Sequence, residues 1–145
     1  MAHDPISHLQ RLTAVNASAA FNGLAQFHVD SAQEGAVEIH MKWNDEFTQY
    51  SGYLHAGLIA ALLDTACGFA AVTVAGNVTA SHFSMNCLKP AIGRRFIAKG
   101  FTVRAGRKQV LARAELFAES DQDERALVAT GESLLVPIDQ DGSRR

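Results

Sequence analysis

The stretch from Leu54 to Ala75 constrains the fold of this chain more than any other part of the sequence. It has the sequence LHAGLIAALLDTACGFAAVTVA, in which almost every side chain is apolar or small on all sides of a helix. A helix that is apolar all round is normally surrounded by protein. The stretch therefore predicts one long central helix that the rest of the chain covers on nearly all sides.

Asp64 is the one acidic residue in this stretch, which contains no Lys or Arg. Because burying an unpaired charge costs a large free energy, a carboxylate at this position points to a function. A membrane-spanning helix is the alternative, since about 20 apolar residues can cross a bilayer. The central Asp64 and the high content of Ala and Gly argue against it, and we expect no membrane segment.

The length of 145 residues and the 48% content of hydrophobic residues fit a single soluble domain spanning residues 1–145. Cys67 and Cys87 form neither a disulfide framework nor a zinc-binding spacing, so the sequence predicts no metal site. The first residues lack the basic and apolar segments of a secretory signal. These features predict a cytoplasmic protein.

Flanking the central helix, the sequence predicts one further helix and six strands. A helical segment within residues 1–17 is expected from apolar residues at helical spacing over residues 7–15. Between Val37 and Trp43, apolar residues alternate with Glu38, His40 and Lys42, which is typical of a strand with one buried face. The predicted strands cover residues 25–31, 36–43, 79–88, 95–105, 109–118 and 127–137, followed by a frayed tail at 139–145.

The order of these elements predicts an α+β protein in the hot-dog arrangement, in which a curved antiparallel sheet wraps around one long helix. Short connections among the last four strands predict that consecutive strands are antiparallel neighbours. A single curved sheet leaves one side of the helix open. We therefore expect a second copy of the chain to close it, giving a homodimer.

Basic residues are concentrated in one part of the chain. Eight Lys or Arg residues and no acidic residue lie between Lys89 and Arg113, although the net charge is −2. These residues are either the solvated faces of strands or a site for an anion. A pI of about 6.3 and the lack of a nucleic-acid-binding motif argue against nucleic acid as that anion. A phosphorylated small molecule suits a local cluster better.

The segment Gly52–Ala66, GYLHAGLIAALLDTA, resembles the helix start G-x-L-H-G-G, with an acid nine residues after the His, of PaaI-type hot-dog acyl-CoA thioesterases. Leu88-Lys89-Pro90 and Gly106-Arg107 are similar to further elements of that family. The resemblance implies hydrolysis of an acyl-CoA or aryl-CoA thioester. It implies no metal or redox cofactor, because coenzyme A is part of the substrate.

His55 and Asp64 are nine residues apart, about 13.5 Å along a helix and on opposite faces of it. Either they are unrelated, or each site combines the helix start of one chain with the acid of another, as the resemblance implies. The expected assembly is a homodimer or a dimer of dimers. Asp64 would act as general base or as nucleophile, the alternative being a structural acid bonded to a neighbouring strand.

The same resemblance implies roles for further residues. The backbone N–H of Ala56 or Gly57, free at the helix start, is the expected oxyanion donor, and His55 would brace this loop. Ala56 departs from the family's Gly. Gln49 would bind the thioester carbonyl or the attacking water.

Two groups of substrate-binding residues are also expected. Thr79 or Ser81 would lie opposite the acid, with His82 as a competitor, because the segment 79–90 is one residue longer than the family pattern. Gly106, Arg107 and Lys108 would hold the phosphates of coenzyme A, with Arg94 or Arg95 as alternates.

Two other functions fit the same sequence features. Hydration or dehydration of an acyl thioester also needs a His and an acid, which His55 and Asp64 could supply across a dimer. A non-catalytic acyl-CoA-binding protein would be expected to carry a DNA-binding module, for which 145 residues leave no room. The spacing of Gln49 and His55 favours hydrolysis.

Overall fold

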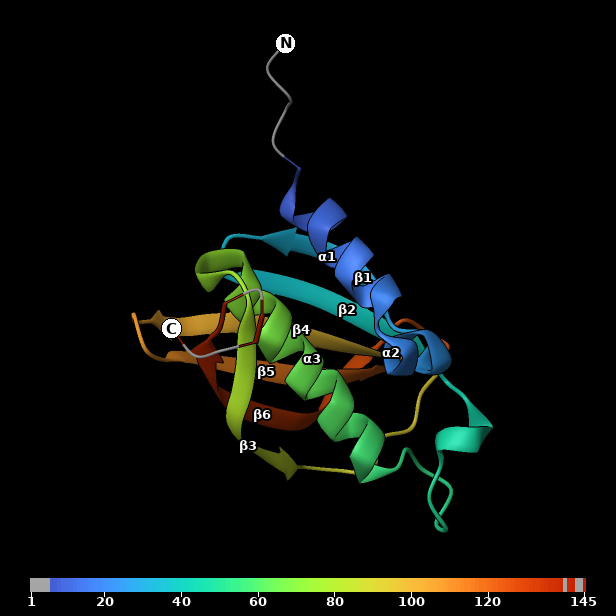
Figure 1. The fold of residues 1–145 in the computed structure, drawn as a ribbon. Helices are drawn as coiled ribbons and strands as arrows, with labels where there is room; N and C mark the ends of the chain where they lie inside the picture. The colour runs from blue at the N-terminus through green and yellow to red at the C-terminus, as the bar shows by residue number, and fades with distance from the viewer. Residues whose placement is uncertain (1–5, 140, 143–144) are drawn as a thin grey trace.

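Six antiparallel strands form one sheet in the order β1-β2-β4-β5-β6-β3. The long helix α3 (Ala56–Ala75) lies across the concave face of this sheet (Figure 1). The computed structural model describes residues 6–139, 141–142 and 145. The predicted hot-dog arrangement is confirmed.

Two short helices precede the sheet. Ser7 caps the start of α1 (His8–Ser18) through a capping box with Gln10, and this helix confirms the one predicted over residues 7–15. The second helix, α2 (Ala20–Ala25), was not predicted, and it ends at a residue in the left-handed conformation. The first strand therefore begins three residues later than expected. Residues 1–5 of the predicted N-terminal segment lie outside the described residues.

The strand positions agree with the predicted ranges to within a few residues. β2 buries Val37, Ile39 and Met41 and turns its alternate residues away from the core, as its sequence pattern predicts. The bounds are β1 (His28–Gln33), β2 (Ala36–Lys42), β3 (Val78–Cys87), β4 (Arg95–Ala105), β5 (Val110–Glu119) and β6 (Arg125–Pro137).

The prediction that β3 and β4 are neighbours is wrong. β3 pairs with β6 at one edge of the sheet, so β6 and β5 lie between β3 and β4. Three strand spacings measure about 14 Å, whereas the seven residues that connect β3 to β4 can extend over about 24 Å. A short connection therefore does not require adjacency. This connection passes beneath the start of α3, where the Leu54 N–H donates to the carbonyl oxygen of Ala91 at 3.0 Å.

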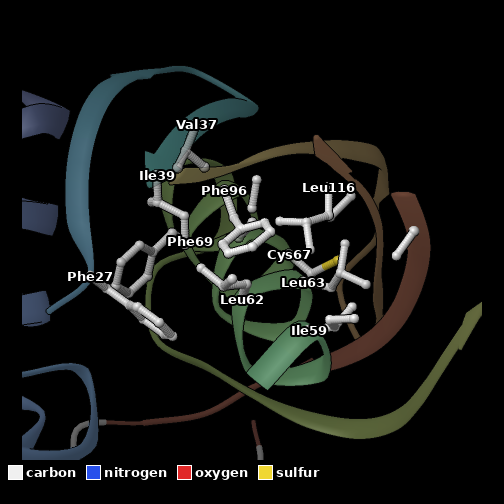
Figure 2. Close-up of a cluster of buried hydrophobic side chains, with 14 of the residues drawn as sticks. Phe27, Val37, Ile39, Ile59, Leu62, Leu63, Cys67, Phe69, Phe96 and Leu116 are labelled. Atoms are coloured by element: carbon white, nitrogen blue, oxygen red, sulfur yellow. The ribbon is translucent and has the colours of Figure 1, made fainter. Parts of the chain in front are cut away.

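The inner side of α3 packs directly on the sheet. A Cβ at Gly100 of β4 would lie 2.2 Å from the carbonyl oxygen of Ala66, so only glycine permits this approach. Figure 2 shows Leu62, Leu63 and Cys67 of α3 among side chains from the strands. The helix is long and apolar enough to cross a membrane, but here it forms the core of a sheet-wrapped protein.

The outer side of α3 is open, which corrects the expectation of a helix covered on nearly all sides. Nine of its 20 residues are buried, and Asp64 is exposed. The helices α1 and α2 lie to one side of α3 and β3 lies to the other (Figure 1). Residues of α3, of β3 and of the two N-terminal helices line a cavity on this open side.

The tail predicted over residues 139–145 is described only in part, because residues 140, 143 and 144 lie outside the described residues. Arg145 Nε donates to Oδ1 of Asp139 at 3.2 Å. The Ile138 N–H, just before this tail, donates to the carbonyl oxygen of Asn77 at 2.9 Å.

Candidate active site

His55 is the N-terminal cap of α3. Its Nδ1 accepts a hydrogen bond of 2.8 Å from the backbone N–H of Gly57. Because Nδ1 is the acceptor, this bond requires the neutral ring with its proton on Nε2. The expected bracing role of His55 at this turn agrees with this contact, and the His55 side chain is exposed.

The His55 cap determines which backbone N–H group at the helix start can donate to a ligand. The expectation that Gly57 offers a free N–H is wrong, because this group is bonded to His55. Within the described part of the chain, the N–H of Ala56 has no hydrogen-bond partner. Ala56 is therefore the one of the two candidates that can donate to a ligand.

Gln49 lies in the loop before α3 and lines the same cavity as His55 and Ala56, which has a volume of about 470 Å³. The side-chain oxygen of Gln49 accepts a hydrogen bond from the Ser51 N–H, and its NH₂ group donates to no described residue. Its backbone N–H donates to the Tyr53 carbonyl oxygen at 2.9 Å. The structure thus brings the predicted residues Gln49, His55 and Ala56 together.

Asp64 lies in a separate cavity of about 310 Å³ on the open side of α3. Asp64 is open to solvent on one side, but the apolar residues around it partly desolvate its carboxyl group, which raises the pKa of Asp64 above its usual value of 3.8. No residue that lines this cavity is basic, and no described residue forms a hydrogen bond or ion pair with Asp64. The alternative of a structural acid bonded to a neighbouring strand therefore has no support in the single chain.

Of the two hydroxyl residues expected opposite the acid, Thr79 lines the Asp64 cavity. Ser81 does not, and its Oγ donates to the carbonyl oxygen of Leu134 at 3.2 Å. The pairing of β3 with β6 is shifted between Ala80 and His82, so Ser81 is the extra residue of a β-bulge. This bulge lies within the segment 79–90, which was expected to be one residue longer than the family pattern.

The basic turn at Gly106, Arg107 and Lys108 connects β4 to β5 and is exposed. It is closed by the Gly106 N–H, which donates to the Gln109 carbonyl oxygen at 2.8 Å. Within the described chain, no acidic residue pairs with Arg107 or Lys108.

The position of this turn follows from the strand register. Val110 pairs with Leu135, and Leu135 pairs with Ala80. Both Leu135 and Ala80 line the Asp64 cavity. The turn is therefore at the same end of the sheet as that cavity.

Arg94 and Arg95, the alternates for binding phosphate, have other partners. Both bond to Glu119, which is 3% exposed. Arg94 also pairs with Asp123, and Arg125 contributes a third arginine to Glu119 at 2.9 Å. Hydrogen bonds from Arg95 and Arg125 lower the pKa of Glu119 to about 2. Arg94 and Arg95 are therefore already bonded to acidic residues and hold the turns around Glu119 in place.

Sequence reasoning missed part of the Asp64 cavity. Thr65 and Phe69 of α3 and Val15 and Asn22 of the N-terminal helices line it. Gly68 and Val72, which also line it, could have been found from their spacing of four and eight residues from Asp64. Thr65 and Phe69 do not have this spacing. Val15 and Asn22 could not have been found, because their position depends on how α1 and α2 pack.

The model of the thioesterase superfamily matches residues 51–124, a segment that contains the start of α3, Asp64 and the basic turn. The chain belongs to the thioesterase superfamily. Membership supports thioester hydrolysis as its general activity, and hence a hydrolase. The solved structures of this fold support a soluble protein.

Individual proteins are also similar to this chain. A thioesterase family protein of Silicibacter pomeroyi is 31% identical, with a TM-score of 0.85 over 90% of this chain and 97% of that one. The Escherichia coli PaaI protein of the phenylacetic acid degradation operon has the same fold, at 19% identity and a TM-score of 0.77 over 90% of this chain and 96% of that one. A Saccharolobus solfataricus protein that carries the name of an esterase is 28% identical over 64% of this chain and 67% of its own length.

Proposed function

We propose that the protein hydrolyses an acyl-CoA or aryl-CoA thioester to the free acid and coenzyme A, in the cytoplasm and without a metal or redox cofactor. One observation carries this proposal. A carboxylate with a raised pKa and an unpartnered backbone N–H at a helix start lie in two separate cavities of the chain. Together they are the base and the oxyanion donor that thioester hydrolysis needs.

Because the proposed base and oxyanion donor lie in different cavities of one chain, a complete site requires a second copy of the chain. His55 and Asp64 lie on different sides of α3, so one chain holds two half-sites rather than one site. β3 is an edge strand that pairs only with β6 among the described strands, and most of its residues are exposed. An edge of this kind is a template for pairing with another strand. We infer a homodimer, or a dimer of dimers, that joins the Asp64 half-site of one chain to the helix-start half-site of its partner.

In this composite site the thioester carbonyl accepts a hydrogen bond from the Ala56 N–H, and the Gln49 NH₂ group binds the carbonyl oxygen or the attacking water. Asp64 either takes a proton from water, which attacks the carbonyl carbon, or attacks that carbon itself to form an anhydride that water then cleaves. In both routes the C–S bond breaks and the departing thiolate takes up a proton. Both routes require Asp64 to be ionised.

The nucleotide end of coenzyme A would lie at the basic turn. Arg107 and Lys108 are exposed and pair with no acid of the described chain, whereas Arg94 and Arg95 are held by Glu119. Charge-assisted hydrogen bonds to phosphate are among the stronger polar contacts. Gly106–Lys108 is therefore the better of the two candidate phosphate sites.

Asp64→Asn tests the proposal. Asn has almost the same shape but can neither accept the proton nor attack well, so release of free thiol from a panel of CoA thioesters should fall by about 10² to 10⁴. Turnover within about threefold of the wild type, in protein that keeps its fold, would contradict a general-base role. Loss of an enoyl-CoA substrate without thiol release would instead indicate a hydratase.

A further inference from the structure

The Asp64 cavity has a wall that comes from the N-terminal helices. Its floor is the open face of α3 from Asp64 to Val72, eight residues or about 12 Å along the helix. β3 forms one side, and Val15 of α1 and Asn22 of α2 form the other. Figure 1 shows the corresponding arrangement, with β3 and the α1–α2 pair on opposite sides of α3.

The two wall residues differ in chemistry. Val15 is 43% exposed in the single chain and presents an apolar side chain to the cavity. Asn22 is 9% exposed, and its Nδ2 donates to Oδ1 of Asn16 at 3.0 Å. The Nδ2 of Asn16 in turn donates to the Phe27 carbonyl oxygen at 2.7 Å. This relay fixes the Asn22 side chain and occupies one of the two N–H groups of its amide.

The remaining polar atom of Asn22 is its side-chain oxygen. Within the described part of the chain, no donor is hydrogen-bonded to this oxygen. Among the described residues, the fully buried side-chain oxygen that lacks a partner is that of Thr102, so the Asn22 oxygen keeps some access to solvent. Because Asn22 lines the Asp64 cavity, its oxygen can accept a hydrogen bond from a ligand hydroxyl there.

We propose that the α1–α2 pair forms the wall that selects the acyl group, with Val15 limiting its length and Asn22 accepting a hydrogen bond from a hydroxyl on it. The inference rests on the proposed function, because it places the acyl group of the thioester along α3 beside Asp64. A site that binds a substrate hydroxyl rejects the analogue that lacks it more strongly than an apolar pocket rejects an extra methylene. Asn22 therefore selects the acyl group by its polarity, and Val15 selects it by its length.

The length limit is tested with straight-chain CoA thioesters from acetyl to lauroyl. Val15→Phe narrows the cavity and should lower kcat/KM for the longest accepted chains by about 10-fold relative to acetyl-CoA. Val15→Ala should shift the preference toward longer chains. Ala17→Phe is the matched control, because it adds the same ring to an exposed position of α1 that does not line the cavity, and it should leave the order of substrates unchanged.

The polar contact is tested with hexanoyl-CoA and its terminally hydroxylated counterpart. Asn22→Leu should remove the preference for the hydroxylated substrate by lowering its kcat/KM about 10-fold or more while that for hexanoyl-CoA changes less. Thermal melts accompany this variant, because it also breaks the bond to Asn16. If it does not fold, the Val15 pair decides the inference.

Failure of the proposed function and failure of this inference give different results. A wild type that releases no coenzyme A from any thioester contradicts the proposed function and this inference with it. An active wild type whose Val15 variants retain the wild-type order of substrates contradicts this inference alone.

Discussion

The backbone N–H of Gly57 donates a hydrogen bond of 2.8 Å to Nδ1 of His55, and this contact leaves little space for a side chain at position 57. A Cβ there would lie 3.0 Å from the same nitrogen, so the His55 ring would have to shift. The glycine is therefore favoured by the close approach of the histidine ring, not by an unusual backbone angle. It keeps the cap in place and leaves the Ala56 N–H as the available donor.

Gly57→Ala should displace the His55 ring and lower both thermal stability and kcat. Loss of an N-cap bond costs about 0.5–2 kcal/mol. Gly23→Ala in α2 is the control, because a Cβ there meets no atom within 4 Å. This substitution should stabilise α2 by up to about 1 kcal/mol. A Gly57→Ala protein with a wild-type melting temperature and kcat would show that the cap has no such role.

The raised pKa of Asp64 makes stability depend on pH. The folded state holds the Asp64 proton more tightly than the unfolded chain, so its contribution to stability is greatest below the usual value of 3.8 and is lost as pH rises through the folded-state pKa. Asp64→Asn should therefore be more stable than the wild type at neutral pH and about equal to it below 3.8. Denaturant unfolding at several pH values measures this difference, and a constant difference would contradict the predicted linkage.

Composite sites predict complementation between two inactive variants. Asp64→Asn protein and a Gln49→Ala, His55→Ala double variant each spoil both sites of a homodimer, but a mixed dimer contains one intact site. Unfolding the two proteins together and refolding them as a mixture should restore about a quarter of the wild-type activity. Each variant refolded alone is the control. No recovery from a mixture that forms dimers would place both residues in one chain's site.

Arg107→Ala should raise KM with little change in kcat, because it removes a phosphate contact that is the same in the ground and transition states. Steady-state kinetics on the best CoA thioester measures this. Lys42→Ala, at an exposed position of β2, removes the same charge elsewhere and should leave KM unchanged. An unaltered KM in Arg107→Ala would move the nucleotide site away from the basic turn.

Glu119→Gln should destabilise the protein at neutral pH, because the charged carboxylate bonds to three arginines. The lowered pKa means that this stabilisation is complete above the usual value of 4.5 and disappears as pH falls toward about 2. Melting temperatures of wild type and variant should therefore converge over that range. Glu132→Gln, which affects an exposed pair with Arg113, should change little at any pH. Parallel curves for Glu119→Gln would contradict this interpretation.

The sequence was sufficient where local patterns decide the structure. The alternation from Val37 to Met41 fixed the buried face of β2, and the apolar run before Gly76 located α3. The grouping of Gln49, His55 and Ala56 in one cavity was also predictable, since they are close in the sequence. They lie close together in the fold because one loop connects Gln49 to the start of α3.

Other features depend on contacts that sequence patterns do not encode. β3 lies at the edge of the sheet because its partner is β6, which is some 50 residues away in the chain. Asp64 is exposed because the sheet covers only one side of α3. The contribution of Val15 and Asn22 depends on the docking of α1 and α2, and α2 itself is too short to give a clear helical period.

The separation of the two cavities within each chain also sets how the rate of the proposed enzyme depends on its own concentration. A lone protomer carries a base without an oxyanion donor in one cavity and a donor without a base in the other, so it turns over nothing. Above the dissociation constant of the dimer, the rate grows in proportion to total protein. Below that constant, mass action makes it fall with the square of total protein, and saturating substrate that bridges the two chains restores linearity by holding them together.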